Sequence, residues 1–361
     1  MSDKIYRQLS ETLDTLPNGF PVTDSGVEIK LLKKIFSPEQ AELFCDLRLT
    51  WETAEQIGER TGRTLEGLEK MLLGMREHGQ IQGISLDGTM IYRMLPWLFG
   101  IYEFQLHHLD RQMAELNEEF LPHYLKQYHK NKPHGFQVIP IEEEISSEQE
   151  CMPYERVSNI IENSQSFMVF DCLCKKEQGL IGNPCDKPLE VCMGFAPIPG
   201  AFDNSTHGRA ISKDEAKAVL DRAEEAGLVH ITDNYQSDHF YICNCCGCCC
   251  GVLQGITRMG MNASEVINSH YYAVIDEEAC TVCGTCADER CQVSAIEEGE
   301  DVYEIIPEKC IGCGLCISTC PSEAIKLIHR PKEDILTPPI DRDNWFEERG
   351  KVRGVDFSKY K

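Results

Sequence analysis

The sequence ACTVCGTCADERCQVSAI (residues 279–296) is followed by the similar sequence KCIGCGLCISTCPSEAI (residues 309–325). The two stretches form an internal repeat of about 30 residues, and each has three cysteines at steps of three residues and a fourth shortly after. The eight cysteines are Cys280, Cys283, Cys286, Cys291, Cys310, Cys313, Cys316 and Cys320. Three thiolates at this spacing can surround one face of an inorganic core, because the loop between them curls with its amides toward the sulfurs. The repeat therefore predicts two metal-binding loops.

This region, about residues 270–330, closely resembles the bacterial ferredoxins that hold two [4Fe–4S] clusters. In that family the fourth cysteine of each run binds the cluster of the other run. The resemblance therefore implies one cluster on Cys280, Cys283, Cys286 and Cys320, and a second on Cys310, Cys313, Cys316 and Cys291. Zinc is the alternative, because zinc sites also use pairs of cysteines with two residues between them. Two interlocked runs of four cysteines favour iron–sulfur clusters over zinc.

The first run departs from the family pattern, whereas the second matches it through Pro321. Four residues (287–290) separate Cys286 from Cys291 where the family has three, and Gln292 stands where proline is usual. This departure leaves open the exact position of Cys291 at its cluster and the reduction potential of that cluster.

Ten further cysteines lie in the middle of the chain. They are Cys172, Cys174, Cys185, Cys192, Cys243, Cys245, Cys246, Cys248, Cys249 and Cys250. Neighbouring side chains of an extended stretch point to opposite faces, so we expect Cys245 and Cys246, or Cys249 and Cys250, to serve different faces. One or two further [4Fe–4S] clusters are the favoured interpretation. A structural zinc using four thiols, or thiols that are merely buried, are the alternatives. Cys45 and Cys151 stand alone, and we do not expect them to be ligands.

The composition restricts the compartment and the partners. The 361 residues carry 35 Lys and Arg against 59 Asp and Glu, a net charge of −24, which disfavours nucleic acid as the main partner. No apolar stretch is long enough for a membrane span, and the N-terminus has no export pattern, so we expect a cytoplasmic protein without a membrane span. In a reducing cytosol clustered cysteines are metal ligands rather than disulfides.

We expect an α+β, multidomain chain in five parts. Residues 1–95 resemble a winged helix, with two helices over 53–78 and a hairpin that turns at Asp87 and Gly88. This part lacks a basic stripe, which favours packing or docking over DNA binding. Residues 96–150 are expected to form a long helix from Leu98 to about Tyr128, carrying His107, His108, His123 and His129, and then a linker.

The other three parts are defined by the positions of the two cysteine groups and by the segment that comes after them. Residues 151–265 are expected to form an α+β cysteine-rich iron–sulfur domain, with a helix capped by Ser212 and Glu215 and a hairpin that leads into Cys243. Residues 266–330 are expected to form a ferredoxin-like ββαβ repeat with two clusters, and residues 331–361 an extended docking tail.

These features favour an iron–sulfur electron-transfer protein, a cytoplasmic subunit of an anaerobic oxidoreductase complex whose other subunits are its redox partners. No phosphate-binding loop, nucleophile elbow or nicotinamide fingerprint indicates a substrate site, so no catalytic residue is assigned. The alternatives are an iron–sulfur reductase with a substrate site at the middle cysteines, and a redox-sensing regulator.

Overall fold

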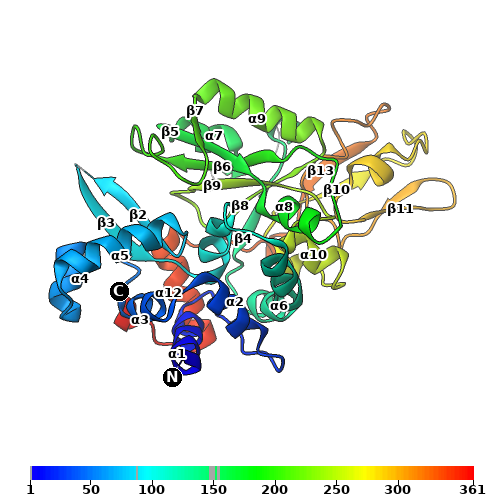
Figure 1. Ribbon diagram of the computed structural model, residues 1–361. Coiled ribbons are helices and arrows are strands. Elements are labelled where there is room, and N and C mark those ends of the chain that lie inside the picture. Colours follow the sequence, from blue (N-terminus) through cyan, green and yellow to red (C-terminus); the bar gives the residue numbers. More distant parts are fainter. Residues whose placement is uncertain (1, 87, 146–150, 153–154) are drawn as a thin grey trace. The chain divides into compact units, whose positions relative to one another are not determined.

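A computed structural model describes residues 2–86, 88–145, 151–152 and 155–361. The chain divides into two units, Met1–Asn131 with Phe346–Lys361, and Lys132–Trp345 (Figure 1). Both contain helices and strands, which confirms the α+β class. The five-part domain division remains a prediction.

The first unit opens with the helices α1 (Ser2–Thr15), α2 (Val27–Ile35) and α3 (Pro38–Asp46). Ser37 caps α3 because its hydroxyl accepts a hydrogen bond from the Gln40 amide, and the Gln40 side chain accepts one from the Ser37 amide. Pro38 at the first helical position lacks only an amide hydrogen that the helix leaves free.

The predicted pair of helices with a hairpin is present in this unit. The elements are β1 (Glu52–Thr53), α4 (Ala54–Thr61), α5 (Leu65–Glu77), β2 (Ile81–Leu86) and β3 (Thr89–Met94), with an antiparallel sheet in the order β1-β3-β2. Gly62 ends α4 at a positive φ of 71°. Asp87 lies outside the described residues. The winged-helix likeness remains a resemblance.

The long helix expected from Leu98 begins instead at Arg111, as α6 (Arg111–Lys130). The Asp110 carboxylate caps it by accepting a hydrogen bond from the Met113 amide at 2.9 Å. The apolar periodicity before Asp110 belongs to two short turns, Trp97–Ile101 and Glu103–Gln105, in which Phe99 has a positive φ of 50°. His123 and His129 therefore lie on the helix, whereas His107 and His108 precede it.

The C-terminal tail is helical rather than extended, with α12 (Arg342–Arg353) and short 3₁₀ turns at Lys332–Asp334 and Ser358–Tyr360. In the first unit the fully buried Arg349 donates hydrogen bonds to the carbonyls of Pro17, Asn131 and Tyr128. Its guanidinium lies 4.1 Å from the centre of the Tyr128 ring. These buried contacts hold the segment in place, so the prediction of an extended tail is wrong.

The second unit is built on a six-stranded antiparallel sheet in the order β4-β8-β9-β6-β5-β7 (Figure 1). The strands are β4 (Phe136–Ile139), β5 (Ser166–Asp171), β6 (Glu190–Ala196), β7 (Arg209–Ile211), β8 (Val229–Asp233) and β9 (Tyr241–Cys245). The hairpin predicted before Cys243 is confirmed as β8 and β9. Strand β4 lies inside the predicted linker, and all four of its residues are buried, so the linker prediction is wrong there.

Two helices cover one face of this sheet. They are α7 (Val157–Glu162) and α9 (Lys213–Glu225), and the Ser212 hydroxyl caps α9 as predicted. Their apolar residues pack on alternate residues of the strands, such as Phe167 and Val169 of β5. On β9 the same face takes Ile242, so the alternation places Cys243 and Cys245 on the opposite face.

The remaining helices of this unit are α8 (Leu173–Leu180), α10 (Gly251–Thr257) and α11 (Ala263–Val266), and a 3₁₀ turn spans Glu142–Glu144. The repeat region forms two antiparallel pairs, β10 (Tyr271–Ile275) with β13 (Ile325–His329), and β11 (Ile296–Glu298) with β12 (Tyr303–Ile305). A π-helical turn, Cys286–Arg290, stands between β10 and β11. This order differs from the expected ββαβ repeat. Among the described residues, no helix has both the length and the apolar character that a membrane crossing requires.

Candidate metal centres

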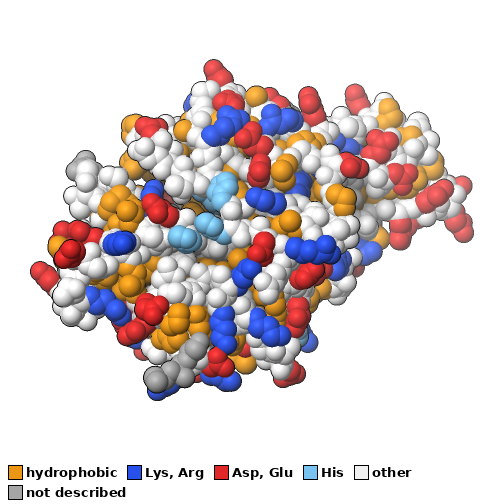
Figure 2. Space-filling view, viewed as in Figure 1, with side chains coloured by type: hydrophobic (Ala, Val, Ile, Leu, Met, Phe, Trp, Pro, Cys, Tyr) orange, Lys and Arg blue, Asp and Glu red, His pale blue; other side chains and the backbone are white. Residues whose placement is uncertain are grey.

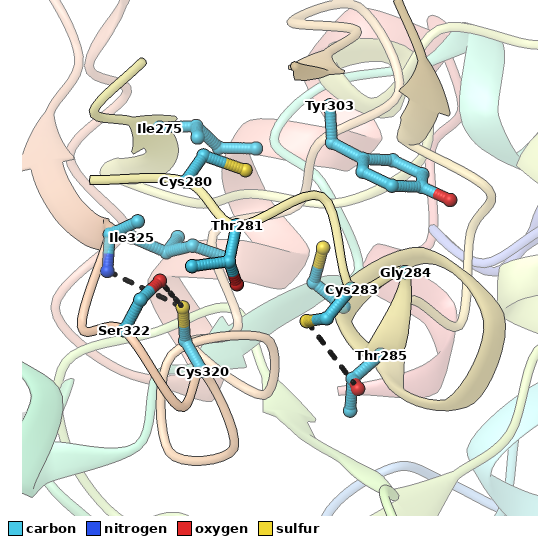
Figure 3. A pocket seen from close by; sticks show the side chains of 12 residues that line it. Ile275, Cys280, Thr281, Cys283, Gly284, Thr285, Tyr303, Cys320, Ser322 and Ile325 are labelled. Carbon is cyan, nitrogen blue, oxygen red and sulfur yellow. Dashed lines mark hydrogen bonds between the residues drawn. The ribbon is translucent and has the colours of Figure 1, made fainter. Parts of the chain in front are cut away.

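Three cysteines of the first repeat and one of the second surround a single cavity (Figure 3). Cys280, Cys283 and Cys286 come from the loop after β10, and Cys320 comes from the loop before β13. Tyr303 contributes to the wall of this cavity. The structure thus brings together the four cysteines assigned to one cluster by resemblance. Their role as ligands remains a prediction.

The remaining cysteine of the first repeat, Cys291, lies near the cysteines of the second repeat. Burial, with the nearby sulfurs of Cys291 and Cys310, raises the pKa of Cys313 to about 12. Burial also raises the pKa of Cys316, and the sulfurs of Cys313, Cys310 and Cys291 act in the same direction. A cation that binds thiolates offsets this cost, because metal ligation requires deprotonated sulfur.

The two repeats have the same backbone conformation around their cysteines. Positive φ angles recur at matched positions, Val282 with Gly312, Gly284 with Gly314, and Ser294 with Glu323. The amides that follow also match, because the Ala295 amide donates to Cys291 Sγ at 3.1 Å and the Ala324 amide donates to Cys320 Sγ at 3.3 Å. Such amide–sulfur hydrogen bonds stabilise thiolates.

The extra residue of the first run has a structural explanation. The four residues between Cys286 and Cys291 close a π-helical turn, in which the Cys291 amide bonds to the Cys286 carbonyl at 3.0 Å. The turn places Arg290 so that its buried guanidinium donates to the carbonyls of Glu224 and Glu225 at the end of α9, and to that of Leu315. The insertion therefore joins the repeat region to the middle region.

Gln292, which replaces the usual proline, makes a second such contact. Its side-chain oxygen accepts a hydrogen bond from the Gly247 amide at 3.1 Å. A Cβ atom at Gly247 would lie 1.8 Å from the Gln292 carbonyl oxygen, so only glycine fits. The loop of middle cysteines is thus packed directly on the first run.

Six of the ten middle cysteines form a closed ring of interacting side chains, which we name the six-thiol ring. Cys172 interacts with Cys174 and Cys192, Cys250 with Cys174 and Cys245, and Cys243 with Cys192 and Cys245. The ring joins β6, β9, the N-terminal end of α8 with the residue before it, and the residue before α10.

The other four middle cysteines form a separate group, which we name the thiol tetrad: Cys185, Cys246, Cys248 and Cys249. Their sulfurs all lie within 4.8 Å of one another. Cys245 and Cys246 fall into different groups, as do Cys249 and Cys250, which agrees with the expectation from the sequence. Only the first pair lies at a strand end, because Cys249 and Cys250 lie in the turn between β9 and α10.

Each of the two groups contains one cysteine whose pKa is lowered, so that its thiolate is stabilised. Hydrogen bonds with Cys174 and Cys192 lower the pKa of Cys172 well below its usual value, and the Lys175 ammonium adds to the effect. A hydrogen bond with Cys249 lowers the pKa of Cys246 to about 5, and Lys175 again contributes. Lys175 is buried and donates a hydrogen bond to the Pro188 carbonyl at 2.6 Å. One buried cation therefore favours thiolates in both groups.

Three residues of these centres were missed from the sequence. Lys175, Arg290 and Gln292 are polar and occur in otherwise ordinary stretches, and only the departures at 287–290 and at Gln292 signalled two of them. Cys45 and Cys151, which were expected to stand alone, belong neither to the six-thiol ring nor to the thiol tetrad.

Comparison with known proteins agrees with the repeat region. Residues 303–326 match the family model described as a 4Fe-4S binding domain. A ferredoxin of Rickettsia felis is 44% identical over 90 residues, which are 24% of this chain and 76% of that protein. Ferredoxin-1 of Caulobacter vibrioides is 34% identical over 110 residues, covering 25% of this chain and 90% of that protein.

A more distant match is one subunit of an ion-translocating oxidoreductase complex of Methanosarcina acetivorans. It is 43% identical over 51 residues, which are 14% of this chain and 19% of that protein. No solved structure matches the chain. The matched 4Fe-4S domain and the coverage of two ferredoxins show that the chain belongs to the ferredoxin family and is an iron–sulfur electron carrier.

Proposed function

We propose that this protein passes single electrons through several [4Fe–4S] clusters as a subunit of a larger anaerobic oxidoreductase. The observation that carries the proposal is the exchange of cysteines between the repeats, with Cys320 in the cavity of the first run and Cys291 beside the second run. Exchanged ligands keep two clusters close, and close clusters are suited to electron transfer.

Two clusters are assigned to the eight cysteines of the repeat region. The first is bound by Cys280, Cys283, Cys286 and Cys320, and the second by Cys310, Cys313, Cys316 and Cys291. Each cluster supplies a one-electron redox centre, whereas the chain supplies thiolates, amide hydrogen bonds to sulfur and limited exposure, all of which tune the potential.

A third cluster is assigned to the six-thiol ring, which offers more thiols than the four that a cubane needs. Its cysteines are Cys172, Cys174, Cys192, Cys243, Cys245 and Cys250. The contacts of Arg290 and Gln292 tie the middle region to the first run. They support a continuous path for electrons between the two regions.

The β11–β12 hairpin is the proposed docking surface for a redox partner with a basic patch. Its exposed acidic residues are Glu297, Glu298, Glu300, Asp301 and Glu304, and residues 296–305 contain no Lys or Arg. Acidic side chains gather over this hairpin in the space-filling view (Figure 2). Tyr303 of the same hairpin lines the cavity of the first run, so a partner docked here lies beside a cluster.

The match to a protein of an oxidoreductase complex supports the assembly part of the proposal. That protein is described as a subunit of an ion-translocating oxidoreductase complex, and its match covers 51 residues of this chain.

The test is to group single cysteine-to-serine variants by the electron paramagnetic resonance (EPR) signal that each removes. After anaerobic purification and reduction, C283S and C320S should lose the same signal and retain the other. C291S and C313S should retain the signal that the first pair loses. C151S is the matched control, because Cys151 lies outside both groups, and it should keep all signals.

A different grouping would contradict the proposal. If C320S and C313S removed the same signal, each run would bind its own cluster. If every variant except C151S lost all iron together, the cysteines would not form separate centres.

A further inference from the structure

The thiol tetrad has a geometry of its own. The sulfur of Cys185 lies 3.8 Å from that of Cys246 and 3.7 Å from that of Cys248, and the sulfurs of Cys248 and Cys249 are 3.6 Å apart. Cys185 precedes β6, whereas the other three follow β9, so the tetrad joins two loops that are far apart in the sequence. Cys246 and Cys249 are buried, and Cys248 is exposed.

These distances match four sulfurs around one tetrahedral ion. A Zn–S bond of about 2.3 Å places tetrahedral sulfurs about 3.8 Å apart, since the edge of a tetrahedron is about 1.63 times its centre-to-corner length. The four thiolates of a cubane bind four different irons at its corners, so their sulfurs spread farther.

The repeat region provides an internal comparison. Within the described residues, which include all 20 cysteines, the tetrad is the only group of metal-ligating side chains whose ligand atoms all lie within 4.8 Å of one another. The cysteines of the two runs are not so close together, although they surround a cavity. The tetrad is therefore more compact than the cysteine groups of the repeat region.

We propose that Cys185, Cys246, Cys248 and Cys249 bind a single zinc ion with a structural role, distinct from the iron–sulfur clusters. Tetrahedral sulfur ligation suits zinc, and zinc binds such a site more tightly than ferrous iron in the usual affinity order. Zinc undergoes no redox change, so this site stands outside the path of electrons.

The position of the tetrad explains what the ion does for the fold. Gly247, between two of its ligands, is packed against the carbonyl of Gln292 and donates its amide to that side chain. A zinc ion that fixes Cys246 and Cys248 thereby fixes the loop on which the first cluster-binding run rests. Zinc binding releases the thiol protons, and its affinity therefore rises with pH.

The test is metal analysis of the anaerobically purified full chain with any affinity tag removed. We expect about one zinc per chain, and X-ray absorption at the zinc edge should show four sulfurs at about 2.3 Å. C185S and C248S should lower the zinc content more than tenfold while the EPR signals of the clusters persist. C151S should keep its zinc.

Three results would contradict the proposed zinc site. Wild-type protein grown with both metals that contained iron but no zinc would overturn the proposal, as would zinc with nitrogen or oxygen ligands. Loss of iron rather than zinc in C248S would assign the tetrad to a cluster. Zinc retained in a preparation without clusters would support this site and contradict the proposed electron-transfer function, so the two failures are distinguishable.

Discussion

At the scale of single residues, burial shifts the pKa values of two titratable side chains near the end of β8. Asp233, at the end of β8, is buried and accepts a hydrogen bond from the Tyr235 hydroxyl at 2.7 Å. Burial raises its pKa to about 7, although the hydrogen bonds from Tyr235 and Tyr241 oppose the rise. The nearby His239 has its pKa lowered to about 4 by burial, so it stays neutral.

The raised pKa of Asp233 predicts a pH-dependent stability. Below pH 7 the folded chain keeps a proton that the unfolded chain has lost, so this contribution falls as the pH rises through 7. Between pH 6 and pH 8 the loss is about 1.4 kcal/mol. D233N removes the titrating carboxyl group. Between pH 6 and pH 8 the midpoint of thermal unfolding should therefore fall by about 3–5 °C more in wild type than in D233N. D238N, at an exposed turn residue nearby, should behave like wild type, and equal pH dependence of D233N and wild type would refute the assignment.

Gly247 is the residue on which the contact between the middle loop and the first run depends. G247A should lower the midpoint of thermal unfolding by about 2–10 °C, because a Cβ would meet the Gln292 carbonyl at 1.8 Å and overpacking costs about 1–3 kcal/mol. G67A is the matched control, because Gly67 lies within α5 with no atom near its Cβ position, and alanine there should be neutral or stabilising. An unchanged midpoint for G247A would mean that the loop does not rest on the first run.

At the scale of elements, the sequence predicted best where local chemistry decides the structure. The Ser212 cap and the apolar spacing behind it define α9, and the hairpin before Cys243 follows from its strand pattern. The exchange of Cys291 and Cys320 between the runs came from the resemblance to ferredoxins. The alternation of side chains along β9 separated Cys245 from Cys246, whereas Cys249 and Cys250 are separated by the turn before α10.

The predictions failed where contacts between residues far apart in the sequence determine the structure. Strand β4 is short and follows a polar stretch, and it is a strand because it pairs with β8 and with Asn268. The tail contains charged residues at random spacing, yet the burial of Arg349 against three carbonyls holds it as part of the first unit. The ten thiols divide into a ring and a tetrad because the sheet brings Cys185 and Cys192 to the cysteines in and after β9. The spacing of cysteines in the sequence does not reveal this pairing.

At the scale of the whole molecule, the net charge of −24 favours encounter with a basic partner. The triple variant E297Q, E298Q and E304Q should slow electron transfer to such a partner at low ionic strength by about fivefold or more, and the difference should shrink in high salt. The control variant D214N, D221N and E225Q removes equal charge from exposed positions of α9 and should have a smaller effect. Equal slowing in both variants would show that only the total charge acts, and not the hairpin.

Electron transfer by this protein requires inorganic clusters that are held by the thiols of the repeat region. The most direct test is the iron and acid-labile sulfide content of the anaerobically purified wild-type chain. We predict at least about eight iron and eight sulfide per chain, and about twelve of each when the six-thiol ring is loaded. A colourless preparation with no sulfide, or one whose thiols hold only zinc, would contradict the central claim.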